Sequence, residues 1–238
     1  MEDKVALVTG SSRGIGRDIA LRLSDVVSGV AVHYRKRREE ALKVIRAIQK
    51  RGKMSAAFRA DLTKEEEAAR LIEKAIEKFG RLDILINNVG PVLAKPWEEV
   101  KTEEWEYIFR SNLESALFCL KAVLPGMKRR GWGRIINIGY SRVEKLAAYK
   151  DITPYAVAKT GLLILTRSVA RSVASAGITV NMVSPGLIKG GVLPPTIKVP
   201  LGRLGKYEDI SEAVLFLISE KASYITGTNL IVAGGWKL

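Results

Sequence analysis

Short apolar runs of strand length alternate with helical patterns along the whole chain. Residues 5–8 form one such run, which is typical of a buried parallel strand, and Ile15, Ile19 and Leu23 then recur at helical spacing. The alternation predicts further strands at about 30–32, 54–59, 84–86, 135–138, 178–183 and 229–233. It predicts further helices at about 37–50, 64–79, 103–129, 154–176 and 207–219.

A strand followed by a helix, repeated about seven times, predicts one parallel sheet with helices on both faces. Because crossovers between parallel strands are right-handed, we expect a doubly wound, Rossmann-like α/β fold. No segment has the composition of a linker, so residues 1–238 are expected to form a single domain. Gly80 is placed to end one helix, and Pro125-Gly126 marks a point where the longest helix could break.

The composition limits the possible classes of function. Of the 238 residues, 47% are hydrophobic and 27% are charged, as in soluble globular proteins. There is one cysteine, Cys119, and one histidine, His33, so an internal disulfide is impossible and a metal site rich in His or Cys is nearly excluded. No apolar run reaches about 18 residues and the start lacks a signal-peptide pattern, so we expect a cytoplasmic protein that does not span a membrane.

The net charge of +14 at pH 7 favours an anionic partner. That partner could be a nucleic acid, a lipid headgroup, a phosphorylated cofactor or an acidic protein, although a solvated basic surface would explain the charge equally well. The four tryptophans are too scattered along the sequence to form a stacking surface for bases, which argues against nucleic acid.

A glycine-rich turn follows the first predicted strand and opens the first helix. Its glycines permit a tight turn and leave no Cβ between the backbone and a ligand, while the helix start offers free N–H groups to a pyrophosphate. The spacing differs from the common Gly-x-Gly-x-x-Gly fingerprint, and a purely structural turn would also explain it. The residues that would bind the ligand are Gly10, Ser12, Arg13, Gly14, Ile15 and Gly16.

The end of the second strand indicates which dinucleotide would bind. NAD-binding folds carry an Asp or Glu there, about 20 residues after the turn, for the ribose 2′-hydroxyl. This chain has His33, Tyr34, Arg35 and further basic residues instead. Because a guanidinium group pairs with a 2′-phosphate, Arg35, helped by Arg13, predicts NADP(H). The alternative is a basic, solvated start of the next helix.

Tyr155 and Lys159 lie four residues apart near the start of a predicted helix, for which Thr153 would be the N-cap and Pro154 the first residue. The ammonium group and the helix N-terminus would both stabilise a phenolate and so lower the pKa of Tyr155. Tyr155 would then exchange a proton with a carbonyl or alcohol oxygen. Taken alone, such a pair is more often an ordinary surface pair.

Further motifs accompany this pair in a fixed order. They are Thr-Gly-Ser-Ser-Arg-Gly-Ile-Gly at 9–16, Asp61-Leu62, Asn-Asn-Val-Gly at 87–90, Ser111-Asn112-Leu113, Gly-Arg-Ile-Ile-Asn at 133–137, Tyr-Ala-Val-Ala-Lys at 155–159 and Pro185-Gly186. Together they make the chain resemble the short-chain dehydrogenase/reductase family over essentially its whole length. The resemblance implies an NADP(H)-dependent oxidoreductase.

The resemblance also implies roles at the adenine end of the cofactor. Asp61 would bond the adenine amino group, and Leu62 would lie beside that ring. Asn88 and Gly90 would shape the wall beside the adenosine ribose.

At the nicotinamide end, Lys159 would bond the ribose hydroxyls, and Ile188, after Pro185 and Gly186, would contact the carboxamide. Asn112 would hold a water molecule at a kink in its helix, as part of a proton relay through Lys159. The catalytic residues that the resemblance implies are Asn112, Ser141, Tyr155 and Lys159.

The sequence departs from the family pattern around the substrate. The family's serine lies slightly closer to the tyrosine than Ser141 does here, so we expect Ser141 to polarise the substrate carbonyl, with Tyr140 as the alternative. A threonine that often follows Pro-Gly is absent. The segment at about 187–206, rich in Gly and Pro, would be a shortened substrate lid, which implies a more open site.

Within the family the chain looks most like the 3-oxoacyl-acyl-carrier-protein reductases of fatty acid biosynthesis. This likeness implies a carbonyl or acyl-carrier-bound substrate and a homo-oligomer, either a tetramer or a dimer. One alternative is a pteridine or dihydrofolate reductase-like enzyme that reduces a C=N bond. Another is a nucleotide- or nucleic-acid-binding protein without catalysis, against which the intact Asn112, Tyr155 and Lys159 argue.

Overall fold

The computed structural model of the chain describes residues 1–191 and 198–236. In this part of the chain, seven parallel strands form one sheet in the order β3-β2-β1-β4-β5-β6-β7. The strands are β1 (Val5–Val8), β2 (Gly29–Tyr34), β3 (Met54–Arg59), β4 (Ile84–Asn87), β5 (Gly133–Ile138), β6 (Ile178–Pro185) and β7 (Asn229–Val232). Each coincides with a predicted strand, and the expected Rossmann-like architecture is confirmed.

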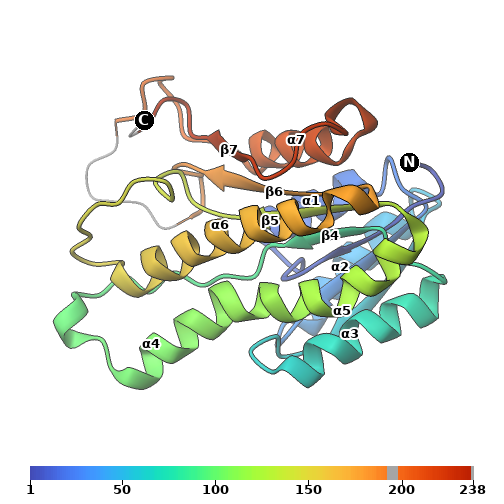
Figure 1. Cartoon of the computed structure of the whole chain (residues 1–238), viewed down its shortest axis with the longest axis horizontal. Coiled ribbons are helices and arrows are strands. Elements are labelled where there is room, and N and C mark those ends of the chain that lie inside the picture. Colours follow the sequence, from blue (N-terminus) through green and yellow to red (C-terminus); the bar gives the residue numbers. More distant parts are fainter. Residues whose placement is uncertain (192–197, 237–238) are drawn as a thin grey trace.

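Helices cover both faces of the sheet (Figure 1). Because alternate residues of a strand point to opposite faces, Ala6 and Val8 of β1 join one hydrophobic core while Val5 and Leu7 join the other. The helices of the first core are α1 (Gly14–Leu23), α2 (Arg38–Gln49) and α7 (Tyr207–Ile218). Those of the second core are α3 (Glu65–Phe79), α5 (Ser115–Arg130) and α6 (Thr153–Val173).

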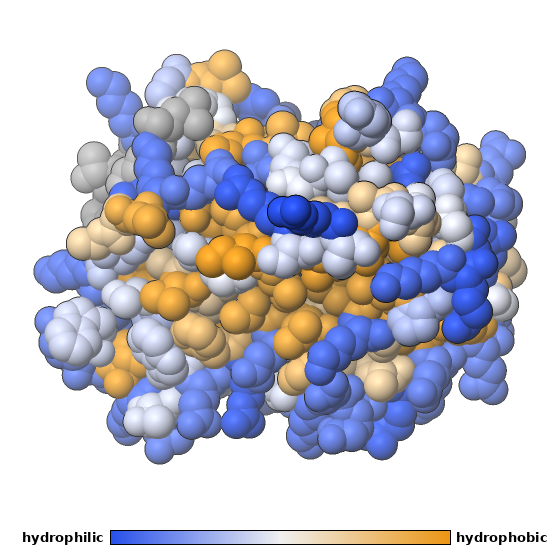
Figure 2. Space-filling view, in the orientation of Figure 1, coloured by the Kyte–Doolittle hydropathy of each residue, from blue (hydrophilic) through white to orange (hydrophobic). Residues whose placement is uncertain are grey.

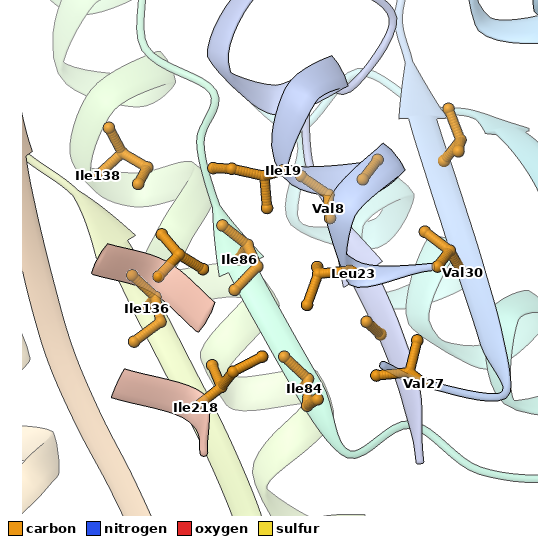
Figure 3. Packing of buried hydrophobic residues seen from close by; sticks show 14 of the residues in the cluster. Val8, Ile19, Leu23, Val27, Val30, Ile84, Ile86, Ile136, Ile138 and Ile218 are labelled. Carbon is orange, nitrogen blue, oxygen red and sulfur yellow. The ribbon is translucent and has the colours of Figure 1, made fainter. Parts of the chain in front are cut away.

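Figure 3 shows the first core at the middle of the sheet, where Ile19 and Leu23 of α1 lie against Val8, Ile84 and Ile86. Branched apolar side chains suit strands that are buried on both faces. Full burial of one such side chain stabilises the fold by about 1.5–3 kcal/mol. This core therefore fixes the end of β1 and the first turns of α1, between which the glycine turn lies.

The long helix predicted at 103–129 is interrupted, but not where the sequence suggested. α4 (Thr102–Phe109) passes into a π-helical segment at Arg110–Glu114 before α5 begins. Pro125 lies inside α5, which runs on to Arg130, so the expected break at Pro125-Gly126 is wrong. Packing of α5 against the sheet outweighs the hydrogen bond that proline removes from the helix.

The ends of two helices test further predictions, of which one is confirmed and one is wrong by a residue. Gly80 ends α3 in the left-handed conformation, as predicted. α6 begins at Thr153 with Ile152 as its N-cap, so Thr153 is the first helical residue and not the cap. Short 3₁₀ turns occur at Trp97–Glu99, Ala174–Ala176 and Glu220–Ala222. Among the residues described, no helix combines the length and apolar character that a membrane crossing requires.

The strand order reverses at β1, which pairs with β2 on one side and β4 on the other. At such a point the connections leave toward opposite faces of the sheet and open a crevice beyond the carboxyl ends of the strands. The glycine turn follows β1 there, and Asn88 follows β4. The fold therefore brings two of the predicted motifs to one place.

Candidate active site

The glycine turn between β1 and α1 has a backbone that requires glycine. Gly10 and Gly14 have φ values of 62° and 57°, in the left-handed region. A Cβ on Gly16 would lie only 2.4 Å from Nδ2 of Asn88. Within the described chain no side chain caps the start of α1 at Arg13, so the first N–H groups of this helix stay available to a phosphate.

The side chain of His33 supports the glycine turn through a hydrogen bond. Its Nδ1 accepts a hydrogen bond from the N–H of Gly10 at 2.9 Å, and its Nε2 lies 3.0 Å from the carbonyl oxygen of Ala60. The ring is therefore the tautomer with its proton on Nε2, and burial lowers the pKa of His33 to about 4. The histidine is therefore a neutral structural residue that positions the glycine turn.

These segments enclose a cleft of about 420 Å³ beyond the carboxyl ends of β1, β2 and β4. Most residues predicted for the adenine half of the cofactor line it, namely Gly10, Ser12, Arg13, Arg35, Asp61, Leu62, Asn88 and Gly90. Gly14, Ile15 and Gly16 follow directly in the first turn of α1. The structure thus gathers this half of the predicted site at one crevice.

The cleft has a basic end at Arg35. One terminal nitrogen of its guanidinium group lies 3.7 Å from the carboxylate of Asp61, and the other donates to the hydroxyl of Tyr107 at 2.9 Å. Burial acts to raise the pKa of Asp61, but two hydrogen bonds from Thr63 and the charge of Arg35 hold it below the usual value. The site therefore presents a carboxylate and a cation side by side.

Tyr155 and Lys159 both lie buried in the first turns of α6, with the lysine Nζ 5.8 Å from the centre of the tyrosine ring. Nζ donates to the carbonyl oxygen of Ile138 at 2.7 Å. Burial raises the pKa of Tyr155 and lowers that of Lys159 to about 7. The expected lowering of the tyrosine pKa is therefore wrong for this geometry, because burial away from solvent disfavours the phenolate.

Asn112 lies in the π-helical segment, and its side chain comes close to Lys159 at Gly90. Its Nδ2 donates to the carbonyl oxygens of Ile108 and Pro91, each at 3.0 Å, while its buried Oδ1 has no hydrogen-bond partner among residues 1–191 and 198–236. A Cβ on Gly90 would lie 2.4 Å from that Oδ1 and 2.8 Å from Nζ of Lys159. Asn112, Gly90 and Lys159 therefore lie in contact distance of one another, and the unpartnered oxygen is placed to accept a hydrogen bond from a water molecule.

The two candidates for polarising the substrate lie together. The hydroxyls of Tyr140 and Ser141 are both buried, and neither has a hydrogen-bond partner in the part of the chain described. The ring of Tyr140 lies 5.4 Å from that of Tyr155, while the N–H of Ser141 donates to the carbonyl oxygen of Pro185. The choice of Ser141 over Tyr140 stays a prediction.

Pro185 is the last residue of β6, and Gly186, the next residue, lies beside Ala233 just after the end of β7. A Cβ on Gly186 would lie 2.7 Å from Cα of Ala233, so the close approach requires glycine. Ile188 is buried and pairs as a bridge with Gly205. Residues 192–197 of the expected lid at 187–206 lie outside the described part of the chain, and the lid stays a prediction.

Some residues that line the cleft were missed by the sequence patterns. Tyr107, Ser111 and Ser115 come from the α4–α5 connection and line the cleft. Their helical spacing of four was visible in the sequence, but nothing in the sequence placed that helix face beside the ends of β1, β2 and β4.

The residues at this crevice fit NADP(H). Gly10, Gly14 and Gly16 leave a space for phosphate that a Cβ would fill or could occupy only with backbone strain. The uncapped start of α1 faces this space. The guanidinium group of Arg35 lies at the end of the cleft where a 2′-phosphate would lie. The buried amine and the unpartnered amide oxygen are the polar groups expected near a nicotinamide ribose.

Comparison with known proteins supports the same conclusion. A family model described as enoyl-(acyl carrier protein) reductase matches residues 10–237. The chain is 39% identical to a Staphylococcus aureus protein named 3-oxoacyl-[acyl-carrier-protein] reductase FabG, over 98% of this chain and 97% of the relative. A Haemophilus influenzae protein of the same name is 40% identical over 99% and 98%.

Solved structures give the same result. A blue fluorescent protein from a metagenomic library, solved in complex with NADPH, is 33% identical with a TM-score of 0.93 and covers 100% of this chain and 99% of its own. A dehydrogenase/reductase from Sinorhizobium meliloti is 30% identical with a TM-score of 0.92, covering 100% and 96%. The chain is therefore an oxidoreductase that belongs to the short-chain dehydrogenase/reductase family.

Proposed function

We propose that this enzyme uses NADP(H) to reduce a 3-oxoacyl thioester, carried on an acyl carrier protein, to the 3-hydroxyacyl thioester. The observation that carries the proposal is the meeting of Tyr155, Lys159 and Asn112 beside a nucleotide cleft with a basic end. The relatives named as 3-oxoacyl reductases support the thioester, and the neighbour solved with NADPH supports the coenzyme.

The proposed chemistry divides between coenzyme and protein. When bound, NADPH supplies the hydride that adds to the carbonyl carbon. Tyr155, whose pKa is raised by burial, keeps its proton at neutral pH and is therefore the acid that protonates the carbonyl oxygen. Lys159, with a pKa of about 7, would return a proton to the phenolate, and a water held by Oδ1 of Asn112 would replenish it.

The substrate would be held by a hydroxyl beside Tyr155. Ser141, as predicted, or Tyr140 would donate to the same carbonyl oxygen and polarise it. The net charge of +14 suits an acidic carrier protein, and Lys128 and Arg129 at the end of α5 are exposed. We also propose that the enzyme is cytoplasmic and that the segment at about 187–206 is a shortened substrate lid.

We also propose a homo-oligomer. Figure 2 shows apolar residues gathered across the middle of the face on which α5 and α6 lie in Figure 1. On α6, Val157 is 45% exposed and Ile164 63% exposed. Apolar side chains on a helix face fit burial against a second copy of the chain.

The test is oxidation of NADPH, followed by its absorbance, with acetoacetyl thioesters of acyl carrier protein or a small thiol. Tyr155→Phe should lower kcat by about 10²–10⁴-fold, because it removes the proton donor, while NADPH binding stays near normal. Tyr224→Phe, a change at a fully exposed tyrosine, is the matched control and should keep full activity. Retained turnover in Tyr155→Phe would refute the assignment of the acid.

The substrate panel separates this proposal from its alternatives. Turnover of a crotonyl thioester alone would favour the C=C reduction that the description of the family model names. Turnover of dihydropteridines or dihydrofolate alone would favour C=N reduction. Either result would overturn the 3-oxoacyl assignment and leave the family unchanged. Membership of an enzyme family argues against the non-catalytic alternative.

A further inference from the structure

Tyr107 of α4 reaches across the nucleotide cleft to Arg35, which is 72 residues away in sequence. The tyrosine hydroxyl accepts a hydrogen bond of 2.9 Å from the guanidinium group, whose carbon lies 5.4 Å from the centre of the tyrosine ring. Both side chains line the cleft. One aromatic residue therefore gives Arg35 a hydrogen bond and a cation–π contact together.

Arg35 lies at the boundary between the nucleotide cleft and a neighbouring surface pocket. It lines the main cleft, and it also lines a second hollow beside it. The residues of this second hollow carry more positive than negative charge: Arg35, Lys36, Arg59, Asp61, Lys64 and Glu67. An anionic group that enters from the main cleft would be attracted to this junction.

The guanidinium group keeps most of its donors for a ligand. It has five N–H donors, of which the Tyr107 bond uses one. Asp61 lies 3.7 Å away, a distance that gives charge attraction without a hydrogen bond. The remaining donors can pair with phosphate oxygens while the contact with Tyr107 is maintained.

The contact with Tyr107 also restricts Arg35. The arginine side chain is 36% exposed and would otherwise sample many rotamers in solvent. A guanidinium group held in one plane loses less freedom when it binds an anion, so its affinity for that anion is higher. A ligand without the anion gains nothing from this restriction.

We propose that Tyr107 is a specificity-determining residue, which holds Arg35 ready for the 2′-phosphate and so raises the preference for NADPH over NADH. The inference rests on the proposed use of NADP(H) and is independent of the substrate, because coenzyme binding needs no carbonyl compound. The two coenzymes differ only in the 2′-phosphate, so their ratio isolates its contribution.

The experiment measures the Kd of NADPH and of NADH from the fluorescence of the bound dihydronicotinamide. Tyr107→Leu removes both contacts and should lower the ratio of the NADH Kd to the NADPH Kd by about tenfold, and Tyr107→Phe by about threefold. Trp105→Leu is the matched control, since Trp105 lies on the same helix with similar exposure and stacks on Phe109. Its ratio should equal that of the unaltered enzyme.

A double-mutant cycle decides whether Tyr107 acts through Arg35. In an Arg35→Leu background, Tyr107→Leu should leave the ratio unchanged. Equal weakening of both coenzymes by Tyr107→Leu, or a shift in the ratio that persists without Arg35, would overturn the proposal. If Tyr107→Leu does not fold, as judged by circular dichroism, the same cycle with Tyr107→Phe gives the decision.

Discussion

The amine of Lys159 is buried inside the fold. This burial predicts that the free energy of unfolding is reduced by an amount that depends on pH. The residue is 2% exposed, and its only hydrogen bond within the described chain is donated to the carbonyl oxygen of Ile138. Burial lowers the pKa of Lys159 from 10.5 to about 7. In the unfolded chain the lysine returns to its ordinary pKa, so the free energy of unfolding depends on pH through this residue.

The sign of the effect follows from the two pKa values. Below pH 7 the amine is charged in both states, and the folded state bears the whole cost of a buried charge. Above pH 7 the folded state releases the proton while the unfolded state keeps it until about pH 10.5, so stability rises with pH. At about 1.36 kcal/mol for each pKa unit, the cost below pH 7 has an upper limit of ~5 kcal/mol.

Lys159→Met keeps the shape of the side chain and removes the charge. It also leaves the carbonyl of Ile138 without its donor, which costs about 1–3 kcal/mol. We therefore expect the variant to be inactive and more stable than the unaltered enzyme by about 3 kcal/mol at pH 6, a rise in Tm of about 6–12 °C. The gain should shrink by about 1.4 kcal/mol for each pH unit above 7 and nearly vanish by about pH 9.

The assay is thermal and urea unfolding at pH 6, 7.5 and 9 without coenzyme. Lys43→Met, a change at an exposed lysine on α2, is the control and should change stability little at any of these pH values. The reasoning is refuted if Lys159→Met is no more stable at pH 6, or if its advantage is the same at pH 6 and pH 9.

Three further variants test other parts of the argument. Arg35→Asp should lower kcat/KM with NADPH about 100-fold relative to NADH, because a carboxylate repels the 2′-phosphate; an unchanged ratio in steady-state assays would exclude Arg35 from that role. Gly16→Ala should cost about 1–3 kcal/mol in urea unfolding and weaken NADPH binding by calorimetry, because its Cβ would lie 2.4 Å from Nδ2 of Asn88; normal affinity would contradict the tight turn. Asp83→Ala should cost about 3–5 kcal/mol in urea unfolding, because the buried carboxylate pairs with Arg81 and Arg130; a stable variant would show that this network contributes little.

The sheet was predictable because its strands are continuous apolar runs. Residues 84–86 show this, since a run of Ile-Leu-Ile fits a strand that is buried on both faces. Strand ends were less predictable. β5 begins at Gly133, two residues before its apolar run, because Gly133 and Arg134 pair with Ile178 and Thr179 of β6. Pairing with a neighbouring strand, which no local pattern records, sets that boundary.

The parts of the site that local patterns describe were also predictable. The glycine turn and the Tyr155–Lys159 pair each occupy a few consecutive residues; the structure places the turn in the cleft and Lys159 beside Gly90, which lines it. Contacts between distant segments were not predictable, and Tyr107 with Arg35 is the clearest case. The direction of the Tyr155 pKa was missed for a related reason, because burial depends on the whole fold while the sequence shows only the neighbouring amine.

Unpartnered polar atoms around Tyr155 argue that this region is built for a ligand. Elsewhere in the sheet, Nδ2 of the buried Asn87 donates a hydrogen bond to Oδ1 of Asn137 across β4 and β5. By contrast, Oδ1 of Asn112 and the hydroxyls of Tyr140 and Ser141 are buried without a partner in the described chain, which costs about 1–3 kcal/mol for each group. A bound coenzyme and carbonyl substrate, with their water, would satisfy them. The same groups that weaken the empty fold should therefore stabilise the complex, so Tm should rise more with NADPH and a non-reacting thioester together than the separate increments predict.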